Sequence, residues 1–404
     1  KKPALRFKGF TDPWEQRKIS ELAEKTYGGG TPTTSNEAFW NGNIPWIQSS
    51  DIVDGKLMGV EPRKYITQTG LNNSATQLVP KDSIAIITRV GVGKLAYMPF
   101  SYSTSQDFLS LSKLNTEPFF TVYACYKKLQ SELNTVQGTS IKGITKDELL
   151  AKTISVPVYS EQKQIGSFFT QLDTLITLHQ RKYEKLVNIK KSMLDKMFPK
   201  NGASVPEIRF KGFTDLWEQR KLGEIAVFSK GVGYSKNDLC EEGTPIILYG
   251  RLYTKYETCI FDVDTFVKEK AGSVYSKGGE VIVPASGETA EDISIASVVV
   301  KPGILLGGDL NIVSPTAEYD SAFLALTISS GATHKYLSSL AQGKSVVHLH
   351  NSDIQSVSAK FPTKREQEKI HLIFGKIDTL ITLHQRKLEK LQNIKKSCLE
   401  KMFV

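Results

Sequence analysis

The chain has 404 residues, a formal net charge of +10 and a pI near 9.1, with 40% hydrophobic and 23% charged residues. This length predicts two or three domains, each with a core of its own. No apolar run approaches the ~18 residues of a membrane-spanning helix, and the first residues lack the apolar segment of a signal peptide. The excess of basic residues favours a polyanionic partner, most often nucleic acid. The alternative is that the charge only keeps the protein soluble.

The cysteines are scattered and show no CxxC or Cys/His ligand spacing: Cys125, Cys240, Cys259 and Cys398. The sequence therefore predicts no disulfide framework and no zinc site, and free thiols without a leader are typical of a reducing cytoplasm. Phosphate-loop, dinucleotide-binding, metalloprotease and deaminase motifs are missing as well. We expect a chain that does not itself catalyse a reaction.

An internal repeat is the most informative feature. Arg6–Lys18 returns with few changes as Arg209–Lys221, 203 residues later. Asp173–Lys182 returns unchanged as Asp378–Lys387, 205 residues later. One unit has therefore been duplicated, and its frame has been kept in both copies.

Two inserts, 25–155 and 228–360, lie between the repeated segments and show little overall similarity. A constant frame with variable inserts is expected of a protein that holds two different readers in one geometry. Lys81–Ile87 nevertheless echoes Lys277–Val283. This echo predicts that the inserts share one fold and differ in their surfaces.

Short elements are predicted along both repeats. Asp12–Glu15 and Asp215–Glu218 each have the spacing of a capping box and predict the start of a short helix. Strands bounded by turn residues are predicted at 83–88, 151–157, 280–283 and 295–300, and helices at 123–133 and 321–340. Each insert is therefore expected to be α+β.

Each repeat ends in a long predicted helix with a strict seven-residue ladder of seam residues, which is typical of a coiled coil. The ladders are Ile165, Leu172, His179, Leu186 and Met193, and Ile370, Ile377, His384, Leu391 and Cys398. Thr363 with Glu366 predicts a capping box for the second helix and Ser160 a cap for the first, and Pro199–Pro206 predicts a linker.

Antiparallel pairing of these helices is the simplest way to cover both seams. Each of about 38 residues would span about 57 Å, with a pseudo-two-fold axis at the centre. His179 and His384 would then approach each other, as partly solvated seam residues or as a pH-sensitive contact. Two basic rows are interpreted as solvated faces, or else as a stripe facing a partner or DNA: Lys185, Lys190, Lys191 and Lys196, and Lys390, Lys395, Lys396 and Lys401.

The first insert resembles a known family in its opening residues. Gly29–Pro32 followed by Phe39–Ile47 is similar to the start of a target recognition domain in the specificity subunits of type I restriction-modification enzymes. Pro157–Ile165 and Phe361–Ile370 resemble the junctions between domain and helix in that family. The second insert departs from the pattern, because Gly231–Gly233 is followed by no Trp-x-Gly-x-Ile-Pro-Trp.

The resemblance implies an α+β chain with two target recognition domains held apart by a coiled coil of two long antiparallel helices. The expected boundaries are 1–157 and 200–361 for the domains with their repeated segments and linker, and 158–199 and 362–404 for the helices. Each domain would read one half of an asymmetric, bipartite target in double-stranded DNA, with half-sites one helical turn, ~34 Å, apart. The helices would set the spacer.

The resemblance also implies partners. Two methyltransferase (modification) subunits would dock on the helices, and restriction/translocase subunits would join them in the bacterial cytoplasm, away from any membrane. S-adenosylmethionine and ATP/Mg would bind those partners, and no cofactor would bind this chain. The alternative is a coiled-coil scaffold that presents two protein- or glycan-binding domains and does not touch DNA.

Candidate DNA-binding residues are exposed basic and polar side chains on turns, because such groups contact phosphates and base edges. They are Gln48, Ser49, Ser50, Arg89, Lys94, Gln106 and Lys142 in the first insert, and Tyr234, Lys236, Arg251, Tyr253, Lys255, Ser286, Lys344 and His348 in the second. A solvated surface role is the alternative for each. Trp40 and Trp46 are interpreted as core anchors, and Gly28–Gly30 as a structural turn rather than a phosphate cradle.

Overall fold

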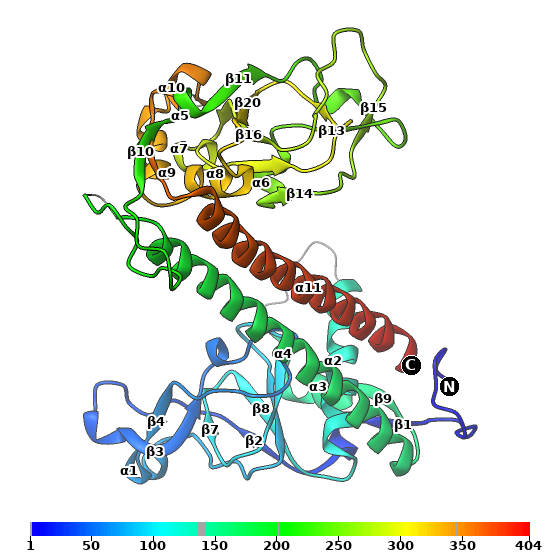
Figure 1. Ribbon diagram of the computed structural model, residues 1–404. Helices are drawn as coiled ribbons and strands as arrows, with labels where there is room; N and C mark the ends of the chain where they lie inside the picture. Colours follow the sequence, from blue (N-terminus) through cyan, green and yellow to red (C-terminus); the bar gives the residue numbers. More distant parts are fainter. Residues whose placement is uncertain (1, 136–142, 201, 344–345) are drawn as a thin grey trace. The chain divides into compact units, whose positions relative to one another are not determined.

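The computed structural model describes residues 2–135, 143–200, 202–343 and 346–404 (Figure 1). Its contacts divide the chain into two compact units. The first comprises Lys1–His179 and Lys387–Val404, and the second comprises Gln180–Arg386. Two 39-residue helices, α4 (Tyr159–Met197) and α11 (Lys364–Met402), contribute to both units.

The first unit is built on a four-stranded antiparallel sheet in the order β2-β8-β5-β6. Its strands are β2 (Ala23–Gly28), β8 (Phe108–Leu114), β5 (Ser83–Ile87) and β6 (Leu95–Met98). A second sheet joins β4 (Lys64–Ile66), β3 (Trp40–Ile47) and β7 (Ser103–Thr104), and a third joins β1 (Glu15–Lys18) and β9 (Thr153–Val156). The helices of the insert are α1 (Gln68–Asn72), α2 (Pro118–Thr135) and α3 (Lys146–Ala151).

The second unit contains a five-stranded sheet in the order β11-β20-β16-β18-β14. Its strands are β11 (Ala226–Lys230), β20 (Leu310–Pro315), β16 (Glu280–Pro284), β18 (Ser297–Val299) and β14 (Cys259–Ile260). Smaller sheets join β12 (Leu239–Cys240), β15 (Phe266–Val267), β13 (Thr244–Ile247) and β19 (Leu305–Leu306), then β10 (Glu218–Lys221) with β22 (Ser358–Phe361), and β17 (Ser286–Gly287) with β21 (Val347–His348). Its helices are α5 (Leu222–Ile225), α6 (Arg251–Thr254), α7 (Ala290–Ile293), α8 (Ser321–Ile328), α9 (Gly331–Leu340) and α10 (Asn351–Ser356).

The two inserts share one topology, as their internal echo predicts. In the central sheets, β11-β20-β16-β18 repeats the order and the antiparallel pairing of β2-β8-β5-β6. In the second sheets, β13 pairs in parallel with β19 as β3 does with β7. The equivalent strands β5 and β16 begin at Ser83 and Glu280. An alignment of Lys81 with Lys277 would place these two starts one residue apart.

The predicted helix starts at Asp12 and Asp215 are wrong. Glu15–Lys18 and Glu218–Lys221 are strands that pair with β9 and β22, so tertiary pairing overrides the local capping pattern. The helical turns come later, at η1 (Ile19–Glu21) and α5. There the carboxylates of Glu21 and Glu224 accept hydrogen bonds from the backbone N–H of Lys18 and Lys221.

Other helix predictions are confirmed with changed ends. The helix predicted at 321–340 is divided into α8 and α9 at Gly331, whose φ of +61° suits glycine. Ser160 lies inside α4 and is not its cap. Glu366 does not close a capping box with Thr363, because both of its carboxylate oxygens accept hydrogen bonds from Arg209.

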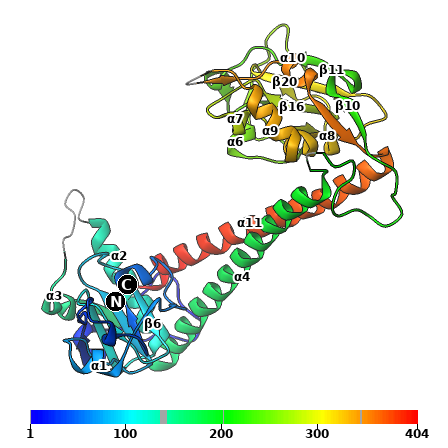
Figure 2. The same cartoon turned by 90° about the vertical axis from the view of Figure 1, so that its left-hand side faces the viewer.

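Four aromatic rings form the centre of each unit where the long helices meet. In the first unit, Phe403 lies 5.6 Å from Phe169 on α4 and 5.7 Å from Phe120 on α2, and Trp14 lies 6.0 Å from Phe120. The C-terminal end of α11 therefore packs against the N-terminal half of α4, which makes this part of the pair antiparallel (Figure 2).

The second unit repeats this cluster with the roles of the helices exchanged. Phe198, just past α4, lies 5.3 Å from Phe323 on α8, 6.4 Å from Phe374 on α11 and 6.1 Å from Trp217. Each insert thus has its core completed by the helix that belongs to the other repeat. The duplication is therefore reflected in matching aromatic contacts inside each unit.

The first two seam residues of each ladder are buried, and the last three are half-buried. Ile165, Leu172, Ile370 and Ile377 are buried. The half-buried members are Leu186, Met193, Leu391, Cys398, His179 and His384. The predicted approach of the two histidines to each other stays a prediction.

Lys395 and Lys190 correct the interpretation of the basic rows as solvated faces. Lys395 lies 2.6 Å from Asp173 on α4, and Lys190 lies 2.6 Å from Asp378 on α11. Each aspartate also accepts a hydroxyl hydrogen bond from its insert. These two lysines therefore belong to the helix seam, while Lys185, Lys191, Lys390 and Lys396 are exposed.

The second unit contains a histidine–aspartate ion pair. His371 Nδ1 lies 2.9 Å from the Asp320 carboxylate, which also caps α8 at Phe323. The hydrogen bond to Asp320 raises the pKa of His371 against the effect of burial. Burial works against the charged Asp320, but the bonds from His371 and Phe323 hold its pKa below the ordinary value.

We expect this pair to stabilise the second unit most between the ordinary pKa values of 3.8 and 6.5. The raised pKa of His371 adds stability below 6.5, which is lost as the pH rises through the folded-state value. The lowered pKa of Asp320 adds stability above 3.8, which is lost as the pH falls. His371→Gln should therefore lower the free energy of unfolding by roughly 1 kcal/mol near pH 6 and by less at pH 9. Urea titrations at both values measure this, and an equal loss at both would contradict it.

Candidate nucleic-acid interface

In the first unit, several predicted turns meet where β5 ends and β8 begins. The backbone N–H of Thr88 donates to the carbonyl of Asp107 at 2.7 Å, and its hydroxyl donates to the same oxygen at 3.0 Å. Ser49 Oγ donates to the Asp107 carboxylate at 3.1 Å. The backbone N–H of Ser105 donates to the carbonyl of Ile47 at 2.9 Å. These bonds bring the turns at 48–50, 88–94 and 105–107 to one edge of the unit.

The predicted residues on these turns differ in exposure. Arg89, Ser50 and Gln106 are exposed, whereas Gln48 and Lys94 are half-buried. Gln106 accepts a hydrogen bond from the Thr31 hydroxyl at 2.7 Å. The backbone N–H of Gln48 donates to the Asp51 carboxylate and begins η3 (Ser49–Asp51). Lys142 lies outside the described residues.

The second unit gathers three of its predicted residues at the corresponding edge. Ser286 Oγ lies 3.1 Å from His348 Nδ1 across the β17–β21 pair. The Tyr253 hydroxyl donates to the Ser286 carbonyl at 2.6 Å, and burial is the main reason that its pKa is raised. His348 is exposed, and Ser286 is buried. Lys344 lies outside the described residues.

Tyr234 and Lys236 lie on the turn between β11 and β12. The Tyr234 hydroxyl accepts from the backbone N–H of Lys270 at 2.7 Å and lies 2.6 Å from Ser273 Oγ. The Lys270 ammonium lies 5.0 Å from the centre of the Tyr234 ring. Tyr234 therefore ties this turn to the loop at 270–273, while Lys236 is exposed.

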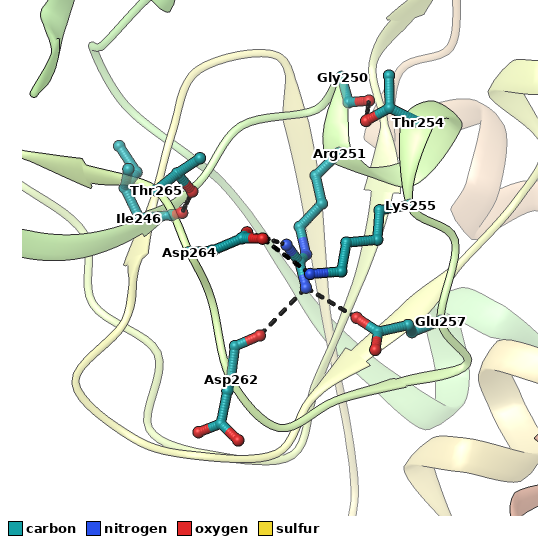
Figure 3. A network of polar contacts seen from close by, with 9 residues as sticks. All are labelled: Ile246, Gly250, Arg251, Thr254, Lys255, Glu257, Asp262, Asp264 and Thr265. Atoms are coloured by element: carbon teal, nitrogen blue, oxygen red, sulfur yellow. Dashed lines mark hydrogen bonds and ion pairs between the residues drawn. The ribbon is translucent and has the colours of Figure 1, made fainter. Parts of the chain in front are cut away.

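Arg251 differs from the exposed candidates, because it is buried. Its guanidinium is buried and donates to Asp264 at 2.8 Å, to Glu257 at 2.7 Å and to the carbonyl of Asp262 at 3.1 Å (Figure 3). Lys255 is also paired with Asp264, at 2.8 Å. Both cations are therefore used to hold the loop between α6 and β15 together.

The glycine run of the first insert is a structural turn. A Cβ on Gly29 would lie 1.8 Å from the carbonyl oxygen of Ser105, so the backbones are too close for any other residue. Trp46 is buried and its indole donates to the Gly30 carbonyl at 3.0 Å, as expected of a core anchor. Trp40 is half-buried, with its ring 5.1 Å from that of Trp46.

The second insert keeps the same close approach, although it lacks the tryptophan motif. A Cβ on Gly231 would lie 1.9 Å from the carbonyl oxygen of Gly307. The segment Gly243–Ile247 (GTPII) takes the place of β3 in the second insert. It shares with β3 only a glycine, a proline and β-branched residues. This short pattern is the signal that could have aligned the inserts.

Within the described ranges, no three His, Cys, Asp or Glu side chains are grouped so that they could hold a metal ion. In the same ranges, no helix has the length and apolar character needed to cross a membrane. The edge described above offers hydrogen-bond donors and acceptors on turns.

Comparison with known proteins gives consistent results. The chain matches the family described as "Type I restriction modification DNA specificity domain" twice, over residues 11–188 and 214–393. It is 23% identical to the MjaIX specificity subunit of Methanocaldococcus jannaschii, with 96% of this chain and 92% of the relative covered. It is 24% identical to the MjaVIII specificity subunit of the same organism, with 95% and 91% covered.

A solved structure supports the fold. The S subunit of a type I restriction-modification system from M. genitalium superposes with a TM-score of 0.68, covering 100% of this chain and 99% of that one. The two sequences are 16% identical, so this similarity concerns the arrangement of elements only.

Proposed function

Since the chain belongs to the family of type I restriction-modification DNA specificity domains, with one copy in each repeat, we propose that each copy reads one half of a bipartite, asymmetric DNA target. The function of the chain is DNA sequence specificity. The proposal of a bipartite target rests on one observation. The same sheet topology appears in both units, and each unit has different side chains at the same edge.

The chemistry of that edge suits duplex DNA. Arginine, glutamine, serine and histidine supply the donors and acceptors that base edges and phosphates require. The formal charge of +10 adds the sequence-independent attraction on which such contacts depend. Two different sets of side chains would select two different half-sites, and a target read in this way is asymmetric.

The proposed partners are subunits that would carry out the reactions which follow DNA recognition. Methylation with S-adenosylmethionine and cleavage with ATP/Mg would be carried out by modification and restriction subunits in the bacterial cytoplasm. The decapeptide Asp173–Lys182 is identical to Asp378–Lys387, so the frame would offer the same surface to two modification subunits. The long helices would set the spacer between the half-sites.

The deciding experiment is selection of a random duplex library by the chain co-expressed with its modification subunits. We expect two short, unrelated motifs at one constant separation. The affinity for the selected duplex should fall linearly with salt on logarithmic axes, because phosphate contacts release counterions. A scaffold for proteins or glycans would enrich no motif at low salt, and that outcome would contradict the proposal.

Exchange of one insert tests the independence of the readers. Replacing 25–155 by the corresponding insert of a relative should change one half-site completely and leave the other half-site and the separation as they were. The same selection measures this. A change in both half-sites would show that the readers do not act separately.

A further inference from the structure

The first unit holds the edge of its central sheet with a pair of backbone hydrogen bonds. Just past β5, the N–H of Thr88 donates to the Asp107 carbonyl at 2.7 Å. The carbonyl of Thr88 accepts from the N–H of Ile144 at 2.7 Å. The two positions next to this frame are therefore Arg89, which follows Thr88, and Gly143, which precedes Ile144.

The second unit builds the same frame from other residues. Just past β16, the N–H of Ala285 donates to the Asp309 carbonyl at 2.8 Å. The carbonyl of Ala285 accepts from the N–H of Leu349 at 3.0 Å. The positions that correspond to Arg89 and Gly143 are thus Ser286 and His348. The backbone is kept, and the pair of side chains is replaced.

The Arg89 side chain is accessible to a partner. Its side chain is exposed, and no residue in the described part of the chain forms a hydrogen bond or ion pair with its guanidinium. The neighbouring position is Gly143, which has no side chain that could occupy this surface. An unpaired guanidinium at a turn presents two parallel donors, which match O6 and N7 of guanine.

His348 is held in one orientation by its neighbours. Its Nδ1 lies 3.1 Å from Ser286 Oγ, and the backbone of Ser286 is in turn fixed by the Tyr253 hydroxyl at 2.6 Å. A Cβ on Gly287 would lie 3.0 Å from that hydroxyl, so glycine leaves room for it. A neutral imidazole that accepts from Ser286 at Nδ1 carries its proton at Nε2 and offers one donor to an acceptor outside the unit.

We propose that the side chains at these two positions, 89 and 143 in the first unit and 286 and 348 in the second, determine the base preference of each reader. Arg89 contacts a guanine edge in one half-site, and His348 donates from Nε2 to a base-edge acceptor in the other. Ser286 is a positioning residue that orients the His348 ring through its contact with Nδ1. The inference rests on the proposed function and adds to it the residues that make the readers different.

The test uses the complete complex with its modification subunits and the same library selection. Arg89→Ala should reduce discrimination at one or two adjacent positions of one half-site by roughly 10- to 100-fold. Arg89→Gln should move the preference at those positions from guanine toward adenine, because an amide matches adenine N6 and N7. His348→Ala should act in the same way on the other half-site and leave the first unchanged.

The role of Ser286 is tested by a change in base preference, which a purely structural role would not produce. Ser286→Ala should relax the same positions as His348→Ala although the histidine is present, and Ser286→Thr, which keeps the hydroxyl, should restore them. Lys81→Ala and Lys277→Ala are the matched controls, since both are exposed and lie just before β5 and β16. These two variants should leave both motifs unchanged.

The outcomes separate this inference from the proposed function. If the unsubstituted complex enriches two motifs but Arg89→Ala and His348→Ala keep them, the inference is overturned and the function stands. Arg89→Ala could instead lower the affinity for all duplexes equally and reduce the slope of log affinity against log salt by about 0.9. That result would show that Arg89 contacts a phosphate only, and it would also overturn the inference. If the unsubstituted complex enriches nothing, the proposed function itself has failed.

Discussion

Phe403→Ala should lower the free energy of unfolding of the first unit by about 3–5 kcal/mol, the usual cost of removing a buried aromatic ring. Phe403 lies just past α11 and is 9% exposed, and it stacks on Phe120 at 5.7 Å. The ring also contacts Phe169 and Trp14, which belong to the other repeat. Its loss would leave a cavity where two helices and the insert meet.

The measurement must report on each unit separately. Amide hydrogen exchange in β8 and α2 should become faster in Phe403→Ala, whereas exchange in β20 and α8 should change little. Phe198→Ala is the matched variant in the second unit and should show the reverse pattern. Val404→Ala, at an exposed neighbouring position, is the control and should behave like the unsubstituted chain. Equal effects of Phe403→Ala and Val404→Ala would contradict the prediction.

Arg6→Ala should cost the first unit about 3–5 kcal/mol, because it would leave an ion buried without its partner. Arg6 donates from Nε and Nη2 to both oxygens of Glu161, at 2.7 and 2.8 Å, and the Glu161 side chain is 0% exposed. The hydrogen bond to this carboxylate raises the pKa of Arg6. Arg209 and Glu366 repeat the arrangement in the second unit at 2.8 and 2.8 Å.

A double-mutant cycle measured by urea denaturation separates the pair from its parts. Arg6→Met combined with Glu161→Leu should recover most of the stability that either change removes, since apolar residues of similar size need no partner. Arg17→Ala is the control, because Arg17 pairs with Glu15 at 2.9 Å on the exposed surface. Its cost should stay below about 1 kcal/mol. If both arginine variants cost the same, burial is not the source of the effect.

The repeated segments show where sequence reasoning succeeds. The identical decapeptide and the seven-residue ladder predicted two long helices, and α4 and α11 have the same length. Such signals are local, because a helix face is covered by residues three and four positions apart. The echo between Lys81–Ile87 and Lys277–Val283 also predicted one shared fold, since a buried strand needs a continuous apolar run in either copy.

Reasoning from the sequence was weaker wherever a residue's role depends on distant partners. Asp12 has the local pattern of a helix cap, yet the following residues pair with β9. Arg251 has the charge of a DNA-binding residue, yet it is buried among acceptors that follow it in the chain. Composition and spacing show which charged and polar groups are present. They do not show which of these groups already have hydrogen-bond or ion-pair partners inside the protein.

The sequence by itself determined the duplicated frame, the long seam helices and the family to which the chain belongs, because identity and periodicity are written in neighbouring residues. Only the tertiary structure decided that Phe403 and Phe198 complete the cores of the opposite repeats. Only the tertiary structure placed Ser286 beside His348 and left Arg89 exposed. The physical reason is that these contacts join segments far apart in the chain, where sheet pairing and helix packing act and no local pattern records the result.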